Sequence, residues 1–141
     1  MVRVCFWQDQ EGRYWGFEAE GHAGWAATGQ DIVCAAISAL TQATVIGLQR
    51  VARLPVESRQ NDEQGVLSCR LQPAGWTSAQ GQSAWLLCET LWQALAEIAE
   101  QYPKHLRLQK VSVSGDGWPV WPGQRKDAKG TLLAGHCGNR G

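Results

Sequence analysis

Two spacings of apolar residues alternate along the chain, and their order limits the folds that it can adopt. A spacing of three and four residues, typical of a helix with one buried face, begins at Asp31 and stops at Leu54 and Pro55. A second such stretch begins near Ser83, a good N-cap residue, and stops before Pro103. The apolar positions of these two predicted helices are Ile32, Ala36, Leu40, Ala43, Gly47 and Val51, then Leu87, Leu91, Ala94, Leu95, Ile98 and Tyr102.

Apolar residues at every second position predict strands around the two helices. Residues 2–7 and the stretch RYWGFEAE (13–20) alternate on either side of the polar turn QDQEG, which predicts a hairpin. The residues expected to share a face are Val2, Val4 and Phe6 in one strand, and Trp15, Phe17 and Ala19 in the other. A second hairpin is predicted from VESRQ and VLSCRL around NDEQG, its polar first strand at a sheet edge, and HLRLQKV predicts a last strand.

These elements predict one domain with a tail. The order of helices and hairpins favours an α+β fold, a two-layer sandwich in which a mainly antiparallel sheet has two helices packed on one face. A chain of 141 residues fits a single core of this kind. Beyond Val113 the sequence is rich in Gly, Pro and charge without a sustained period. We therefore expect a domain at 1–111 and a flexible tail containing Gly, Pro and Trp at 112–141.

Charge and composition exclude several classes of protein. Lys and Arg number 13, as do Asp and Glu, and no dense basic run is present, so nucleic acid is not the expected partner. The N-terminus lacks the pattern of a signal peptide, and no stretch approaches the roughly 20 apolar residues that span a bilayer. We expect a cytoplasmic protein that binds neither nucleic acid nor membrane.

The five cysteines are odd in number and widely scattered, which fits reduced thiols better than a disulfide framework. Cys5, Cys69 and Cys88 fall within strand or helix patterns and are expected to pack in the core. Spacing alone leaves open a zinc site made of His22, Cys34, Cys69 and Cys88. Structural zinc ligands are usually clustered, however, so we expect neither a metal nor a cofactor.

The stretch GHAGWAATGQDIVCAAISALTQ (21–42) contains the strongest candidates for chemistry. With Asp31 as the N-cap, Cys34 is the third helical residue, where unpaired N–H groups and the helix dipole stabilise a thiolate. Asp31, Cys34 and Ser38 are three and four residues apart and share a helix face. A loop turning directly into this helix can bring His22 over the first turn. Such a pair matches the catalytic pair of a thiol hydrolase, in which the imidazole acts as acid and base and the thiolate is the nucleophile.

The same residues also have structural interpretations. A cysteine among alanines on a helix is commonly an inert packing residue, and a loop histidine is commonly solvated. Capping alone explains Asp31, and a mid-helix serine such as Ser38 often donates back to a helix carbonyl. Spacing does not decide between these interpretations and catalysis.

The stretch GFEAEGHAGWAATGQDIVCAAISALTQ (16–42) resembles the signature of the ribosomal-processing cysteine protease family, Prp, also called YsxB-like. The family pattern is approximately GF…GHAGYA…G.DIVCAAVSAL, and here Trp25 replaces a tyrosine and Ile37 a valine. The resemblance covers roughly residues 1–111, because two strands precede the motif and a second helix runs into YPKHLRL. The positions that agree are Gly16, Phe17, Gly21, His22, Ala23, Gly24, Gly29, Asp31, Ile32, Val33, Cys34, Ala35, Ala36 and Ser38.

The resemblance implies an activity and residue roles. It implies a homodimeric endopeptidase that removes the N-terminal extension of the bacterial large-subunit ribosomal protein numbered twenty-seven. Cys34 is then the nucleophile and His22 the acid and base, with Asp31 and Ser38 as supporting residues. A mobile loop gates substrate entry, and its glycines are Gly21, Gly24 and Gly29.

Two rival hypotheses remain open. A non-catalytic module of the same fold could bind a ribosomal protein, in which case Cys34→Ser would leave binding intact. A redox-sensing protein would show oxidation of Cys34 by peroxide, although no second cysteine lies nearby in sequence to resolve a sulfenic acid.

Overall fold

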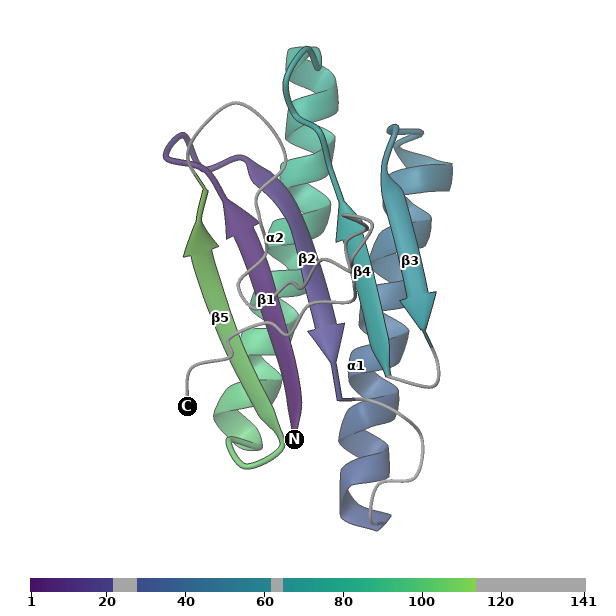
Figure 1. Cartoon of the computed structure of the whole chain (residues 1–141), viewed down its shortest axis with the longest axis vertical. Helices are drawn as coiled ribbons and strands as arrows, with labels where there is room; N and C mark the ends of the chain where they lie inside the picture. The colour runs from purple at the N-terminus through teal and green to yellow at the C-terminus, as the bar shows by residue number, and fades with distance from the viewer. Residues whose placement is uncertain (22–27, 62–64, 114–141) are drawn as a thin grey trace, which may run out of the picture.

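The structure is a computed structural model, and it describes residues 1–21, 28–61 and 65–113. Five strands form one sheet in the order β3-β4-β2-β1-β5, and both helices lie on one face of it (Figure 1). The two-layer α+β prediction is therefore confirmed. The expected tail lies almost entirely outside the described residues.

The first hairpin consists of β1 (Val2–Gln8) and β2 (Tyr14–Glu20), which pair antiparallel as predicted. Val2, Val4 and Phe6 enter the main core together, but Trp15 does not join Phe17 and Ala19. The register shifts between Trp7 and Gln8, so that Gly16 pairs with Trp7 while Tyr14 pairs with Gln8. Because an extra residue in one strand turns the side chains on one side of it to the opposite face, Tyr14 takes the core position.

The second hairpin and the last strand complete the sheet. β3 (Glu57–Asn61) and β4 (Val66–Arg70) pair antiparallel, and the polar β3 is an edge strand as predicted. β5 (Leu106–Ser112) lies at the other edge and runs parallel to β1. The parallel pair follows from the crossover through a helix between two strands of the same sheet.

The first helix, α1 (Thr28–Ile46), continues as a π-helical segment, η1 (Gly47–Val51), and then reaches Pro55. Its buried side differs from the predicted one, since Ile32 and Val51 are 74% and 78% exposed. The residues that are buried along this helix are Val33, Ile37, Thr41, Thr44, Val45, Gly47 and Leu48. Most residues of this stretch are apolar, so periodicity alone could not fix which side faces the sheet.

One stretch of this helix also corrects the expectation about membrane spans. Ile32–Val51 has a mean hydropathy of 1.6 over 20 residues, so by length and composition it could cross a membrane. A third of it is buried against the rest of the domain. Core helices that pack on a sheet meet the same criteria, and nothing here places the chain in a bilayer.

The second helix, α2 (Ser78–Gln101), begins five residues earlier than predicted because Thr77, not Ser83, caps it. The Thr77 hydroxyl accepts a hydrogen bond from the backbone N–H of Gln80 at 3.1 Å, and the Gln80 side chain accepts one from the N–H of Thr77 at 2.9 Å. This reciprocal pair is a capping box. Leu91 and Leu95 of the predicted stripe are buried, whereas Tyr102 is 46% exposed.

The cysteines of the sheet and of α2 are buried as expected, since Cys5, Cys69 and Cys88 are all 0% exposed. Cys5 is nevertheless disulfide-bonded, so the expectation that every thiol is reduced is wrong for this residue.

Glu18 of β2 is a carboxyl only 2% exposed on the sheet face opposite the helices. Desolvation, reinforced by the nearby charge of Glu20 and opposed by Arg70, raises its pKa from 4.5 to about 8. The folded protein therefore keeps a proton between these pH values that the unfolded chain releases. Stability should fall as the pH rises through this window and level off above it.

Glu18→Gln removes the titration and is expected to raise the free energy of unfolding at pH 8, by on the order of 3 kcal/mol, with little effect at pH 4.5. Urea unfolding at both pH values measures this, with the exposed Glu97→Gln as a matched control. An equal pH slope in the parent chain and Glu18→Gln would contradict the assignment.

Candidate active site

Cys34 lies near the start of α1, but one turn deeper than predicted. Because α1 begins at Thr28, Asp31 is inside the helix instead of capping it, and Cys34 is in the second turn. The unpaired N–H groups and the dipole effect belong to the first turn of a helix. The expectation that they act directly on the Cys34 sulfur is therefore wrong.

Positions 31, 34 and 38 lie along one side of α1, since the backbone is helical from Thr28 to Ile46. Cys34 and Ser38 are both half-buried at the edge of the buried side, and Cys34 packs against the main core. The side chain of Asp31 is outside the described part of the structure.

Thr41 supports this turn of the helix, although the sequence did not single it out. Its side chain is fully buried, and Oγ1 donates to the carbonyl oxygens of Ile37 at 2.8 Å and Ser38 at 3.1 Å. A threonine placed three and four residues after Ser38 and Ile37, where its hydroxyl can reach their carbonyl oxygens, is the signal that could have identified it.

The free thiols of the described residues are not equivalent. Cys69 is fully buried, and desolvation raises its pKa to about 12. Cys88 is fully buried as well, and desolvation followed by the charges of Cys69 and Glu89 raises its pKa well above the usual value. Only a thiolate is a good nucleophile, so these two thiols are inert at neutral pH. Cys34 is the free thiol of the described residues that is partly accessible.

Gly21 directly follows β2, which stops at the end of the sheet where α1 begins (Figure 1). Its N–H donates to the carbonyl oxygen of Gly65 at 3.0 Å. Its φ is +87°, and a Cβ there would lie 2.6 Å from the carbonyl oxygen of Met1. Gly21 is thus required by backbone geometry, and it directs the chain from the sheet towards α1.

The other residues predicted for the loop are placed differently. His22 and Gly24 lie outside the described residues, so the distance from His22 to Cys34 stays untested. Gly29 is within α1, which corrects its assignment to the loop that precedes the helix. Of the three predicted gating glycines, Gly21 alone is described at the junction between strand and loop.

The described residues contain no group of three or more His, Cys, Asp or Glu placed to hold a metal ion. Cys69 and Cys88, which belonged to the zinc alternative, are packed among apolar side chains of the main core.

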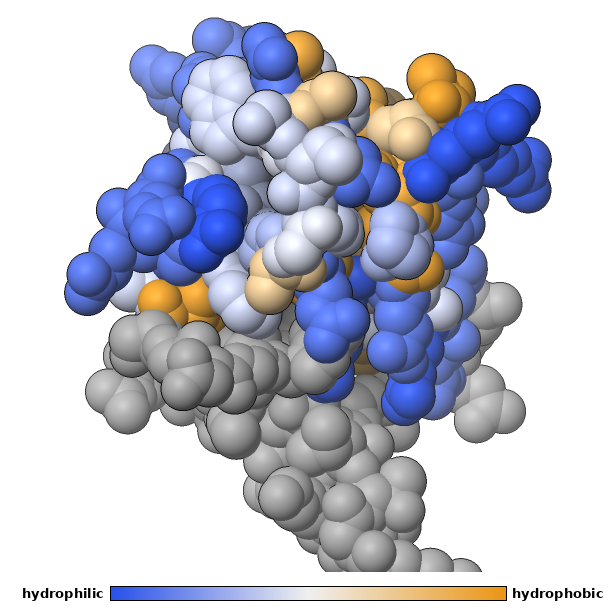
Figure 2. All heavy atoms as spheres, turned by 90° about the horizontal axis from the view of Figure 1, so that it is seen from above, coloured by the Kyte–Doolittle hydropathy of each residue, from blue (hydrophilic) through white to orange (hydrophobic). Residues whose placement is uncertain are grey.

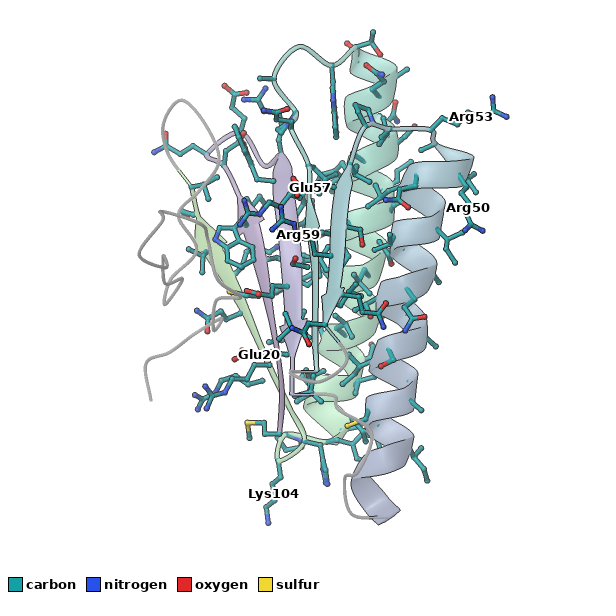
Figure 3. The ribbon with its side chains drawn as sticks, turned by 45° about the vertical axis from the view of Figure 1, so that its right-hand side comes forward. Glu20, Arg50, Arg53, Glu57, Arg59 and Lys104 are labelled. Carbon is teal, nitrogen blue, oxygen red and sulfur yellow. The ribbon has the colours of Figure 1, made fainter. Side chains whose placement is uncertain are left out.

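Charged residues lie towards both ends of the molecule. Glu20 and Lys104 lie towards the end where α1 begins, whereas Arg50 and Arg53 lie at the opposite end of the same helix (Figure 3). A small pocket lined by Arg13, Tyr14 and Trp76 lies at that opposite end, where α2 begins. Viewed from there, the surface is mostly hydrophilic with separate apolar patches (Figure 2). This pocket is therefore not next to Cys34.

Comparison with known proteins identifies a family for this chain. The model of a family described as cysteine protease Prp matches residues 1–107. No curated protein matches the chain.

Solved structures share the fold. The S. aureus ribosomal processing protease Prp in complex with a substrate peptide has 24% identity and a TM-score of 0.69, covering 79% of this chain and 100% of that chain. SMU.848 from Streptococcus mutans has 25% identity and a TM-score of 0.69, with 80% and 99% covered. The S. aureus protease with a covalently linked product peptide has 25% identity and a TM-score of 0.66, with 79% and 100% covered.

Proposed function

Because the chain belongs to the cysteine protease Prp family and is therefore a cysteine protease, we propose that it processes a ribosomal protein. The proposed substrate is the N-terminal extension of the bacterial large-subunit ribosomal protein numbered twenty-seven. The S. aureus structures support a peptide substrate, since one holds a substrate peptide and another a covalently linked product peptide. The assignment of the active site rests on one observation. Cys34, near the start of α1, is partly accessible and is not disulfide-bonded.

The proposed mechanism is nucleophilic. His22 removes the proton from the Cys34 thiol, and the thiolate attacks the scissile carbonyl carbon. The tetrahedral intermediate collapses as the imidazolium protonates the leaving amine, which leaves an acyl group on sulfur. Water, activated by the neutral His22, then hydrolyses the thioester and restores the thiol. Asp31 and Ser38, on the same side of α1 as Cys34, act as supporting polar residues.

The loop that we propose as the gate to this site begins at Gly21. Since its backbone conformation is unfavourable for other residues, the direction in which the chain leaves β2 is fixed at this position. The residues that follow, including Gly24, then move to admit an extended peptide.

We further propose that the enzyme is a cytoplasmic homodimer, because ribosomal proteins are made in the cytoplasm and because α1 and η1 together present Ile32, Ile46 and Val51 to solvent. A second copy could bury these side chains. Sedimentation at a mass of twice 15.5 kDa would support the dimer.

The experiment that tests the function is mass spectrometry of the host ribosomal protein, produced with its native N-terminus and incubated with this protein or with Cys34→Ala. We expect one defined N-terminal peptide to be released by the parent chain only. An intact substrate that co-purifies with both forms would contradict cleavage and indicate a non-catalytic binding module.

A further inference from the structure

The sheet face opposite the helices has an apolar cluster of its own. Cys5 and Trp7 of β1 and Trp15 of β2 form it, and Val111 and Val113 pack against it. The three central residues are only 0%, 1% and 7% exposed. Both described helices lie on the other face of the sheet (Figure 1). Two tryptophans are therefore shielded from solvent on a face that no described helix covers.

The burial continues along β2 beyond this cluster. Glu18 and Glu20 are 2% and 7% exposed, although their neighbours Phe17 and Ala19 point into the core on the helix side. Within the described part of the chain, Glu18 Oε2 has no hydrogen-bond partner. Burying a carboxyl without a hydrogen bond costs free energy. Whatever covers this face must therefore gain more free energy from apolar contacts than the desolvation of Glu18 costs.

The chain leaves the described sheet directly beside the cluster. The N–H of Val113 donates to the carbonyl oxygen of Gln8 at 2.9 Å, next to Trp7. Segment 114–141 follows and has 28 residues, which reach up to roughly 90 Å when extended. A seven-residue strand such as β1 is about 24 Å long, so the segment can cross the sheet more than once.

The composition of segment 114–141 complements this face. Its apolar residues include Trp118, Val120, Trp121, Leu132 and Leu133. It carries four basic residues against two acidic ones, namely Arg125, Lys126, Lys129 and Arg140 against Asp116 and Asp127. The aromatic and aliphatic side chains suit Trp7 and Trp15. These apolar residues, and not the excess of positive charge, make the match, because Glu18 keeps its proton up to about pH 8.

Cys5 identifies the same segment by elimination. The chain has five cysteines, Cys34, Cys69 and Cys88 are free thiols, and Cys5 is disulfide-bonded. Within one chain, Cys137 of segment 114–141 is the cysteine that remains. The segment also lies beyond the family match, which ends at residue 107.

We propose that segment 114–141 packs on the sheet face formed by Cys5, Trp7 and Trp15 and covers it within the same chain. The contact is apolar and does not require the disulfide. A consequence is that this face is closed to a second copy or another partner while the segment is in place. The proposal does not depend on the substrate of the protease.

Hydroxyl-radical footprinting of the full chain tests this cover, with Cys137→Ser in every sample so that no disulfide holds the segment. Trp85, which is 43% exposed on α2, is the internal reference. We expect Trp7 and Trp15 to be oxidised about tenfold more slowly than Trp85. In the chain that also carries Trp118→Ser and Trp121→Ser, they should react within about twofold of Trp85.

Leu86→Ser is the matched control, since it removes an exposed apolar side chain from α2 and keeps Trp85 as the reference, and it should leave Trp7 and Trp15 protected. Rapid oxidation of Trp7 and Trp15 in the Cys137→Ser chain would overturn the proposal. So would protection that survives the loss of Trp118 and Trp121, or protection that depends on protein concentration, which would indicate a second copy as the cover. Circular dichroism checks that each variant is folded.

Discussion

Cys34→Ala is expected to abolish peptide cleavage, with kcat/KM lowered by a factor on the order of 10⁴ or more, because the acyl group of the proposed intermediate is bonded to the Cys34 sulfur. The substitution removes one sulfur from a half-buried position on α1, so the free energy of unfolding should change by only about 1 kcal/mol. Steady-state cleavage of a peptide that spans the processing site, together with urea unfolding, measures both quantities.

Cys69→Ala is the matched control for this prediction. Cys69 is fully buried in β4 with a pKa raised to about 12, so its removal should cost stability and leave kcat/KM nearly unchanged. The assignment of roles fails if both variants lose cleavage equally, or if Cys34→Ala retains it.

Gly16→Ala is expected to destabilise the domain by about 3 kcal/mol or more, the largest loss of stability predicted for a single methyl group here. Gly16 has a φ of +146°, and a Cβ there would overlap the backbone carbonyl oxygen of Cys69 on the neighbouring strand. A backbone atom within a paired strand cannot move aside as a flexible side chain can. Gly16 therefore allows the close approach of β2 to β4 at the bulge.

Gly81→Ala provides the comparison, because Gly81 is helical and nothing lies within 4 Å of a Cβ built on it. Alanine should stabilise α2 there by about 0.5–1 kcal/mol. Urea unfolding of both variants measures the two changes in the free energy of unfolding. Similar effects of the two substitutions would show that Gly16 is not constrained by its backbone.

The strands could be located from the sequence because their apolar residues alternate between one buried and one polar face. The hairpin at residues 2–20, the edge position of β3 and the closing strand β5 were all predicted within two residues. The bulge was not predicted, since an extra residue such as Trp15 changes the register without changing the composition.

The helices were located correctly in outline, but their starts and the buried side of α1 were not. Thr28 and Thr77 mark the true starting regions, whereas Asp31 and Ser83 looked equally suitable as caps. In α1 the stretch around Cys34 is apolar on nearly all sides, so local spacing could not show which side would meet the sheet.

The sequence by itself determined the α+β class, the candidate pair of Cys34 and His22, and the glycine at position 21. These depend on local patterns and on a short motif, which a linear chain displays directly. The sequence also predicted that Cys69 and Cys88 pack in the core. Only the tertiary structure decided that Cys34 stays partly accessible, and that Trp7, Trp15 and Glu18 are buried on the face away from the helices. Burial depends on residues distant in sequence that pack together, and it sets both the accessibility and the pKa of a side chain.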